Sequence, residues 1–195
     1  ELWTDIYAED VPQHAAQELS VRSARQRRDG VKGLGTFVAR EAGRAMQGEL
    51  GLWPPSLGQE AAQVGSARAL APQDFVFPSY REHGVAWVRG LDMRDLLRLY
   101  RGREHGGWDA NEHNLNVPTL VIGSHPLHAA GYAMGIQRDG DVGTGDPTRD
   151  RAAVAYFGDG ATSQGDVSEA MVFAAAASAP VVFVCQNNQW AISVP

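Results

Sequence analysis

Two continuous apolar runs near the C-terminal end of the chain each have the length of a buried β-strand. The first spans residues 152–157 and the second spans residues 181–185. Between them, an alanine-rich segment at about 166–179 predicts a helix, which Pro180 ends. Two strands that are apolar on both faces and joined by a helix form a parallel βαβ unit. This pattern predicts an α/β fold built on a parallel sheet.

Weaker patterns precede this unit. Residues 1–21 are polar, acidic and without a sustained period, which predicts an arm or a linker before a domain at 22–195. Arginines at helical spacing near residues 22–28 indicate a solvated helix face. Further expected elements are helices at 21–47, 57–70, 91–100 (capped by Asp92) and 125–135, a strand at 74–78, a strand or turn at 119–123, and loops at 101–118 and 139–150.

Each apolar run of the βαβ unit ends in a polar cluster. Gly158-Asp159-Gly160 follows the first run and Gln186-Asn187-Asn188 follows the second. Both clusters should lie at the same edge of the sheet, where α/β proteins bind their ligands. A carboxylate and an amide oxygen are suitable ligands for Mg²⁺, and the glycines allow a diphosphate to approach the backbone closely. The pair of clusters therefore predicts a site for Mg²⁺ and a diphosphate.

Composition narrows the classes of function. The chain has 195 residues, of which 44% are hydrophobic and 21% charged, as in an ordinary soluble globular protein. Its net charge of -6 gives no overall attraction for nucleic acid. No run approaches the roughly 18 apolar residues of a membrane span, and no signal peptide opens the chain. With a single cysteine excluding a disulfide scaffold, we expect a cytoplasmic protein that binds neither nucleic acid nor membrane.

Taken together, the motifs resemble the thiamin diphosphate motif, and the wider sequence resembles the alpha subunit of the decarboxylating component of 2-oxoacid dehydrogenase complexes. The resemblance covers roughly residues 25–195. It implies the thiamin-diphosphate-binding fold, an α/β fold with a mainly parallel sheet and helices on both faces. Because the chain begins at Glu1 and ends just after a strand, we expect part of a larger protein, with the fold incomplete at its C-terminus. The matching segments are 158–161 with 187–188, 57–61, 77–81, 124–127 and 188–193.

The resemblance also implies roles for individual residues. Asp159 and Asn188 would ligate Mg²⁺ through their side chains and Trp190 through its backbone carbonyl. Many members of the family have Gly and Tyr where this chain has Gln189 and Trp190, but a main-chain contact tolerates such a change. The glycine turn and an adjacent Tyr-Arg pair would hold the diphosphate, and backbone near residue 120 would contact the aminopyrimidine. The implied cofactor contacts beyond the metal ligands are Tyr80, Arg81, Thr119, Val121, Gly158, Gly160 and Ala161.

The implied activity is oxidative decarboxylation of a small 2-oxo acid with acyl transfer to a lipoyl group. The implied partners are a beta subunit, in an assembly of two alpha and two beta chains, and a lipoyl-bearing acyltransferase. In that family the beta subunit supplies the glutamate that activates the cofactor. Pro54 stands where pyruvate-specific members carry a substrate-binding histidine, which favours a branched-chain substrate.

Histidines near these motifs are candidates for catalytic groups. His83 follows the Tyr-Arg pair by one helical turn, which would let it face the same pocket, and His125 and His128 flank Pro126. The alternative for each of the three is a structural role, as a histidine held in place by hydrogen bonds. His105 and His113 lie in the predicted 101–118 loop, where a surface role is expected. Cys185, inside the second apolar run, is expected to be an inert core thiol.

Three other interpretations remain open. The substrate could be pyruvate or acetoin. The chain could be a non-catalytic assembly subunit of the same fold, although a scaffold has no need for a complete Mg²⁺-diphosphate site. It could also be a nucleotide-binding module, although it lacks a glycine-rich loop ending in Lys-Ser or Lys-Thr.

Overall fold

The computed structural model describes residues 50–56, 58–102, 107–192 and 194, and the single positions 32, 40 and 48. The predicted arm at 1–21, the basic stretch at 22–28 and nearly all of the predicted helix at 21–47 lie outside the described residues. Leu57 and His105 lie outside them as well. The expected domain boundary near residue 22 therefore stays a prediction.

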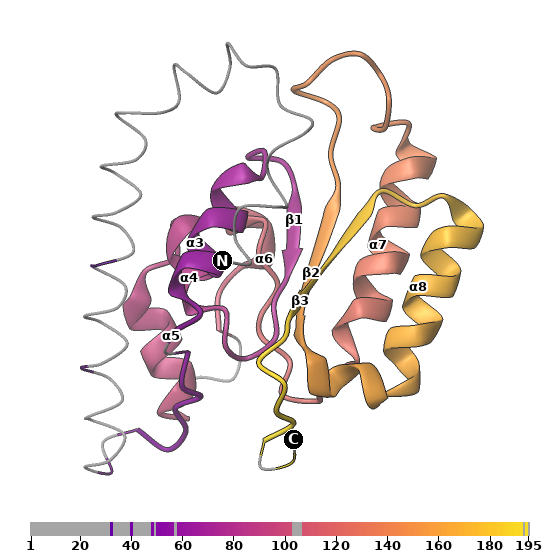
Figure 1. Cartoon of the computed structure of the whole chain (residues 1–195). Coiled ribbons are helices and arrows are strands. Elements are labelled where there is room, and N and C mark those ends of the chain that lie inside the picture. The colour runs from indigo at the N-terminus through magenta and orange to yellow at the C-terminus, as the bar shows by residue number, and fades with distance from the viewer. Residues whose placement is uncertain are drawn as a thin grey trace.

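A three-stranded parallel sheet forms the centre of the described structure (Figure 1). Its strands are β1 (Phe75–Phe77), β2 (Ala153–Gly158) and β3 (Val181–Gln186), in the order β1-β2-β3. In the parallel register, Phe75 pairs with Ala153, and Ala153 pairs with Val181. The predicted strands at 74–78, 152–157 and 181–185 are confirmed, and so is the parallel βαβ unit.

Helices cover one face of the sheet and pack on the strand side chains that point to that face. These helices are α3 (Glu60–Ala69), α4 (His83–Val88) and α5 (Met93–Tyr100). Val76, Val154 and Tyr156 point toward them and join one buried core cluster. The side chain of Asp92 caps α5 by accepting a hydrogen bond from the Arg94 N–H, as predicted.

Two longer helices lie on the opposite face, α7 (His125–Asp139) and α8 (Gly165–Ala177) (Figure 1). Phe75, Phe77, Ala153 and Ala155 pack there against the alanines of α7. Small side chains on α7 allow its backbone to approach the sheet closely. Helices thus cover both faces, which confirms the predicted α/β fold. Among the described residues, no helix is both long enough and apolar enough to cross a membrane.

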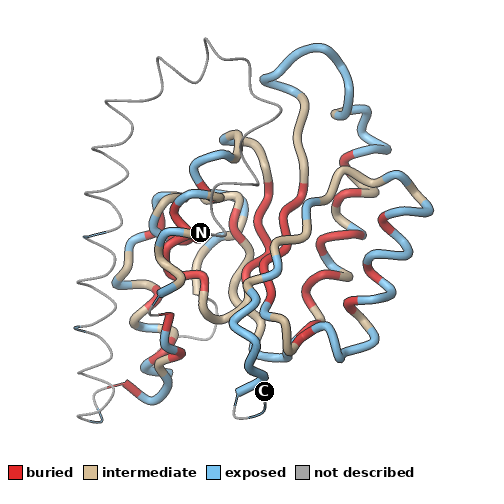
Figure 2. The backbone as a smooth tube through the Cα atoms, in the orientation of Figure 1, coloured by how far each residue is buried: buried red, intermediate tan, exposed pale blue. Residues whose placement is uncertain are grey.

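The expectation that the last strand is buried on both faces is wrong. The side chain of Val182 is 52% exposed and Cys185 is exposed as well, so Cys185 is not the core thiol that the sequence predicts. The physical reason is that β3 pairs only with β2 within the described part of the chain and forms an edge of the sheet (Figure 2). Desolvation and the Asp159 carboxylate nevertheless raise the pKa of the Cys185 thiol, which disfavours its reactive thiolate.

The segment between α5 and α7 is more irregular than the elements around it. It contains one short helix, α6 (Ala110–His113), inside the predicted 101–118 loop. Residues 119–123 form a turn rather than a strand, and Leu120 and Val121 are 60% and 63% exposed. Without a neighbouring strand, this apolar stretch cannot form the hydrogen bonds of a sheet. Of the two predicted possibilities for residues 119–123, a strand or a turn, the turn is confirmed.

Candidate functional site

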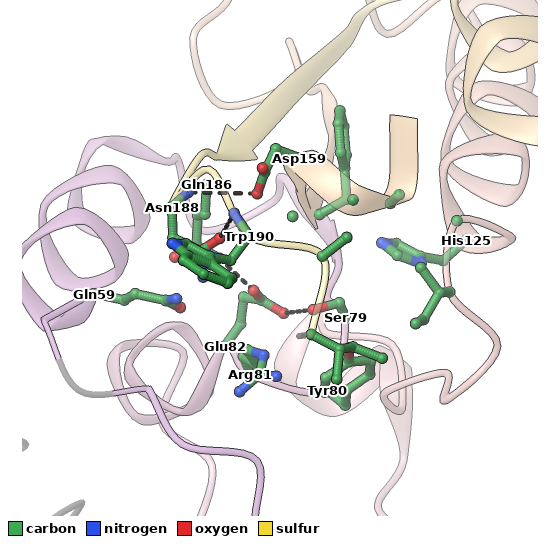
Figure 3. Close-up of a pocket in the computed structure, with 18 of the residues that line it drawn as sticks. Gln59, Ser79, Tyr80, Arg81, Glu82, His125, Asp159, Gln186, Asn188 and Trp190 are labelled. Atoms are coloured by element: carbon green, nitrogen blue, oxygen red, sulfur yellow. Dashed lines mark hydrogen bonds between the residues drawn. The ribbon is translucent and has the colours of Figure 1, made fainter. Parts of the chain in front are cut away.

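A cavity of about 390 Å³ lies beyond the carboxyl ends of the three strands (Figure 3). The loop between β1 and α4 lines one side of it, and the ends of β2 and β3 line another. The start of α7 and the segment before α3 complete its wall. This is the edge of the sheet at which the sequence predicts a binding site.

The polar clusters that end β2 and β3 are in contact across this edge. Gly158 pairs with Gln186 in the β2–β3 register, so the residues that follow each strand are neighbours. The Asn188 N–H lies 3.4 Å from Asp159 Oδ1, to which it donates. Asn188 Oδ1 accepts a hydrogen bond from the Trp190 N–H at 2.9 Å, which folds residues 188–190 into a tight turn (Figure 3). The prediction that the two clusters lie at the same edge of the sheet is confirmed.

A single 3-10 turn, η1 (Asp159–Ser163), lies between β2 and α8. Ala161 is buried, and both it and Gly160 line the cavity. A Cβ atom at Gly160 would lie 2.9 Å from Ala191 Cβ, which is shorter than any normal contact. Only glycine therefore allows the 188–192 turn to pack so closely on η1.

Tyr80 and Arg81 line the cavity from the β1–α4 loop, as the sequence predicts. The guanidinium carbon of Arg81 lies 5.2 Å from the centroid of the Tyr80 ring, a cation–π distance. Arg81 Nη1 donates a hydrogen bond to the Pro55 carbonyl at 2.6 Å. A guanidinium has five N–H donors, so this anchor fixes Arg81 and leaves donors for an anion.

A buried polar chain lies beneath this loop and was missed in the sequence. Ser79 Oγ lies 2.7 Å from Glu82 Oε2, and Gln186 Nε2 lies 2.5 Å from Glu82 Oε1. Gln186 in turn accepts from Gln63 Nε2 at 3.3 Å. Glu82 is only 3% exposed, and this burial raises the pKa of its carboxyl to about 7. In the sequence, Glu82 looks like any glutamate next to an arginine. Only its burial in the folded structure distinguishes it from an exposed one.

The three candidate histidines lie in different environments. His83 is 1% exposed and lies within hydrogen-bond reach of Ser56 Oγ and Tyr100 Oη, at 3.4 and 3.3 Å. Its ring packs on Trp53 at 4.5 Å, and burial lowers its pKa to about 4. His83 does not line the cavity, and neither does His128, which is exposed on α7.

His125 alone of the three lines the cavity (Figure 3). Its Nε2 lies 2.6 Å from the Tyr156 carbonyl oxygen, which can only accept, so Nε2 carries a proton. Burial lowers its pKa, which favours the neutral ring. Nδ1 is then an acceptor, and this buried atom has no hydrogen-bond partner in the described structure.

The predicted aminopyrimidine contacts do not line the cavity. Val121 is exposed and Thr119 is half-buried, while the next residues along, Ile122 and Gly123, do line it. The role of Thr119 and Val121 in binding the aminopyrimidine stays a prediction.

The described residues contain no cluster of three or more His, Cys, Asp and Glu side chains that could hold a metal ion. The predicted Mg²⁺ site is of another kind, because it combines a single carboxylate (Asp159) with an amide oxygen and a backbone carbonyl. Oxygen ligands of this type suit Mg²⁺, which also keeps several water molecules as ligands. The metal site therefore stays a prediction.

Fold and site together define an α/β protein with a polar ligand cavity at the carboxyl ends of parallel strands. The chain belongs to the dehydrogenase E1 component family, whose model matches residues 35–195. This confirms the family resemblance that the motifs indicate.

Individual relatives in this family are dehydrogenase alpha subunits. The chain is 48% identical, over 149 residues, to the 3-methyl-2-oxobutanoate dehydrogenase subunit alpha of Mycobacterium tuberculosis (strain ATCC 25618 / H37Rv). It is 38% identical, also over 149 residues, to the pyruvate dehydrogenase E1 component subunit alpha of Bacillus subtilis (strain 168) and to that of Staphylococcus epidermidis (strain ATCC 12228 / FDA PCI 1200). Each match covers 76% of this chain and 38% of the relative.

Proposed function

We propose that this chain acts as the alpha subunit of a 2-oxoacid dehydrogenase, in oxidative decarboxylation of a 2-oxo acid with acyl transfer to a lipoyl group. One observation carries the proposal. Tyr80 and Arg81 on one side and Asp159 and Asn188 on the other line a single cavity at the carboxyl ends of the strands. An anion-binding pair and a pair of oxygen ligands facing one cavity fit a metal-bound diphosphate.

The E1 component family implies thiamin diphosphate as the cofactor, and the residues present fit it. Arg81 has free donors for phosphate oxygens, and Gly160 and Ala161 of η1 line the cavity. Asp159, Asn188 and the Trp190 carbonyl are proposed as the residues that would hold Mg²⁺. When bound, thiamin diphosphate supplies the electron sink that decarboxylation of a 2-oxo acid requires.

The residues of this chain are proposed to bind and orient the cofactor and to shield it from water. Arg81 and Tyr80 are proposed to hold the diphosphate from the β1–α4 loop, and Gly160 and Ala161 from η1. The buried Phe157 side chain forms an apolar part of the wall and excludes water. Of the three candidate histidines, His125 is the one whose ring reaches the cavity, so its Nδ1 is proposed to accept a hydrogen bond from a bound ligand.

A branched-chain 2-oxo acid is the proposed substrate. It is favoured by the higher identity to the M. tuberculosis 3-methyl-2-oxobutanoate dehydrogenase subunit alpha, 48% against 38% for the pyruvate dehydrogenase relatives. Pro54, buried beside the cavity-lining Pro55, supports it because this position carries a substrate-binding histidine in pyruvate-specific members of the family. The proposed partners are a beta subunit, in a heterotetramer, and a lipoyl-bearing acyltransferase. A cytoplasmic location is proposed from the composition alone.

Calorimetric titration of thiamin diphosphate with Mg²⁺ into the assembled alpha–beta protein tests the proposal. We expect metal-dependent binding that Asp159→Ala abolishes. Asp139→Ala, which removes an exposed carboxylate at the end of α7, is the matched control and should bind as the unaltered protein does. If the folded, unaltered assembly binds no thiamin diphosphate, the chain is a non-catalytic assembly subunit and the proposal is wrong.

A further inference from the structure

A buried glutamate, Glu82, links two sides of the proposed site. Its Oε2 contacts Ser79 of the β1–α4 loop at 2.7 Å, and its Oε1 contacts Gln186 at the end of β3 at 2.5 Å. Arg81 directly precedes Glu82, and Asn188 lies two residues after Gln186. The Glu82 side chain therefore ties the loop that carries the arginine to the strand end that leads to the proposed metal ligand (Figure 3).

The direction of the hydrogen bonds that join Gln63, Gln186 and Glu82 follows from one backbone donor. The Gly84 N–H donates to Gln63 Oε1 at 2.9 Å, which fixes Gln63 Nε2 as the amide end that faces Gln186. Gln186 must then accept through Oε1 and donate through Nε2. Consequently Glu82 Oε1 is an acceptor, and only Oε2, facing the Ser79 hydroxyl, can carry a proton.

The charges around the cavity favour that proton. Arg81 is the only cationic side chain among the described residues that line the cavity, and Asp159 is already a carboxylate there. Among the described residues no ion pair joins Arg81 to Glu82, and Arg81 Nη1 donates to the Pro55 carbonyl instead. Even with the proposed Mg²⁺ held by Asp159, an ionised Glu82 would add a second carboxylate where a polyanion must bind.

The other titratable groups near Glu82 add no positive charge. His83 follows it in α4 and is neutral at pH 7, because burial lowers its pKa to about 4. Tyr100 of α5 has its pKa raised by burial and by Glu82, so it too stays neutral. His125, on α7 across the cavity, also has a lowered pKa.

We propose that Glu82 is a positioning residue that works as a neutral carboxylic acid. It bridges Ser79 and Gln186 and keeps the cavity free of a second negative charge when the diphosphate of the cofactor binds. The proposal rests on the function proposed above. It predicts that a glutamine can replace Glu82, because the Gln amide can accept from Gln186 and donate to Ser79 in the same geometry.

Binding of thiamin diphosphate with Mg²⁺ to the assembled protein, measured by calorimetry from pH 6 to pH 8, tests the proposal. Because only the protonated state of Glu82 is competent and its pKa is about 7, the affinity should fall by about tenfold over this range. Glu82→Gln should bind as tightly as the unaltered protein at pH 6 and lack this fall. The ligand's own titration is common to both proteins and cancels in the ratio of their affinities.

Two further variants separate charge from geometry. Glu82→Leu removes both hydrogen bonds and should bind weakly at every pH. Glu112→Gln, which neutralises an exposed glutamate on α6, should keep the full pH dependence. Titrations in two buffers with different heats of ionisation should show uptake of nearly one more proton by the unaltered protein than by Glu82→Gln at pH 8.

The outcomes separate the two proposals. If the unaltered assembly binds no thiamin diphosphate at any pH, the proposed function fails. If it binds, but Glu82→Gln has the same pH dependence as the unaltered protein, the role of Glu82 is refuted. The role is also refuted if Glu82→Gln binds as weakly as Glu82→Leu, because the charged form would then be the one required.

Discussion

Gly160→Ala is the substitution that most directly tests how the site is assembled. Gly160 has no left-handed backbone conformation, so an alanine there costs nothing in the backbone itself. Its Cβ, however, would lie 2.9 Å from Ala191 Cβ and 3.2 Å from Ala191 Cα. The effect is therefore purely steric, and it acts on the turn that carries Asn188 and Trp190.

The size of the effect follows from where the strain can be relieved. Overpacking by one methyl group costs about 1–3 kcal/mol in a rigid setting. Residues 188–192 are exposed, so they can move away from η1 without disturbing the core. The strain should therefore appear as lost ligand affinity, roughly 5- to 150-fold for that range of free energy. The free energy of unfolding should change little.

Calorimetry with thiamin diphosphate and Mg²⁺ measures the affinity, and thermal unfolding without ligand measures the stability. Gly165→Ala is the matched control, because a Cβ there meets no atom within 4 Å. Adding Ala191→Gly to Gly160→Ala removes the closest contact and should restore most of the affinity. If Gly160→Ala binds as tightly as the unaltered protein, close packing of the turn on η1 is not what builds the site.

Two further predictions concern stability. His83 is buried and its pKa is lowered to about 4, so the unfolded chain binds a proton on this side chain more readily than the folded protein does. The free energy of unfolding should therefore fall by about 3 kcal/mol as the pH drops from 6.5 to 4, and by less in His83→Gln. Denaturant unfolding at several pH values measures this difference. An equal loss in both proteins would exclude His83 as the cause. The Arg89 side chain donates hydrogen bonds to the backbone carbonyls of Ala71, Pro72, Asp74 and His113. Arg89→Lys has fewer donors and should lower the free energy of unfolding by roughly 1–3 kcal/mol. Arg138→Lys, at the exposed end of α7, should leave it unchanged.

The βαβ unit and the contact between its two polar clusters could be predicted because they depend on local patterns. Continuous apolar runs identify the strands, and the parallel topology then places Asp159 and Asn188 at one edge. The exposure of β3 could not be predicted in this way. An apolar run indicates that a strand can be buried, but the number of its neighbours depends on the rest of the fold.

His83 shows why spacing along the chain misleads at the start of a helix. Its spacing along the chain predicts a position one helical turn from Tyr80, facing the same cavity. In the structure α4 begins at His83, so residues 79–82 are not helical and that spacing does not apply. The side chain instead enters the core beside Trp53 and Tyr100. Glu82 was missed for a related reason, because its burial depends on contacts with residues more than 100 positions away.

The alternation of side chains along β3 explains how the polar chain under the cavity is built. Val184 packs into the core cluster on the α3–α4 face of the sheet, whereas Phe183 packs on the opposite face. Because successive side chains of a strand alternate, Gln186 shares the face of Val184 and meets Gln63 of α3 and Glu82. A slip of one residue in the β2–β3 register would turn Gln186 to the other face and break both contacts. The strand register therefore fixes the contacts of Glu82 as firmly as it fixes the contact between Asp159 and Asn188.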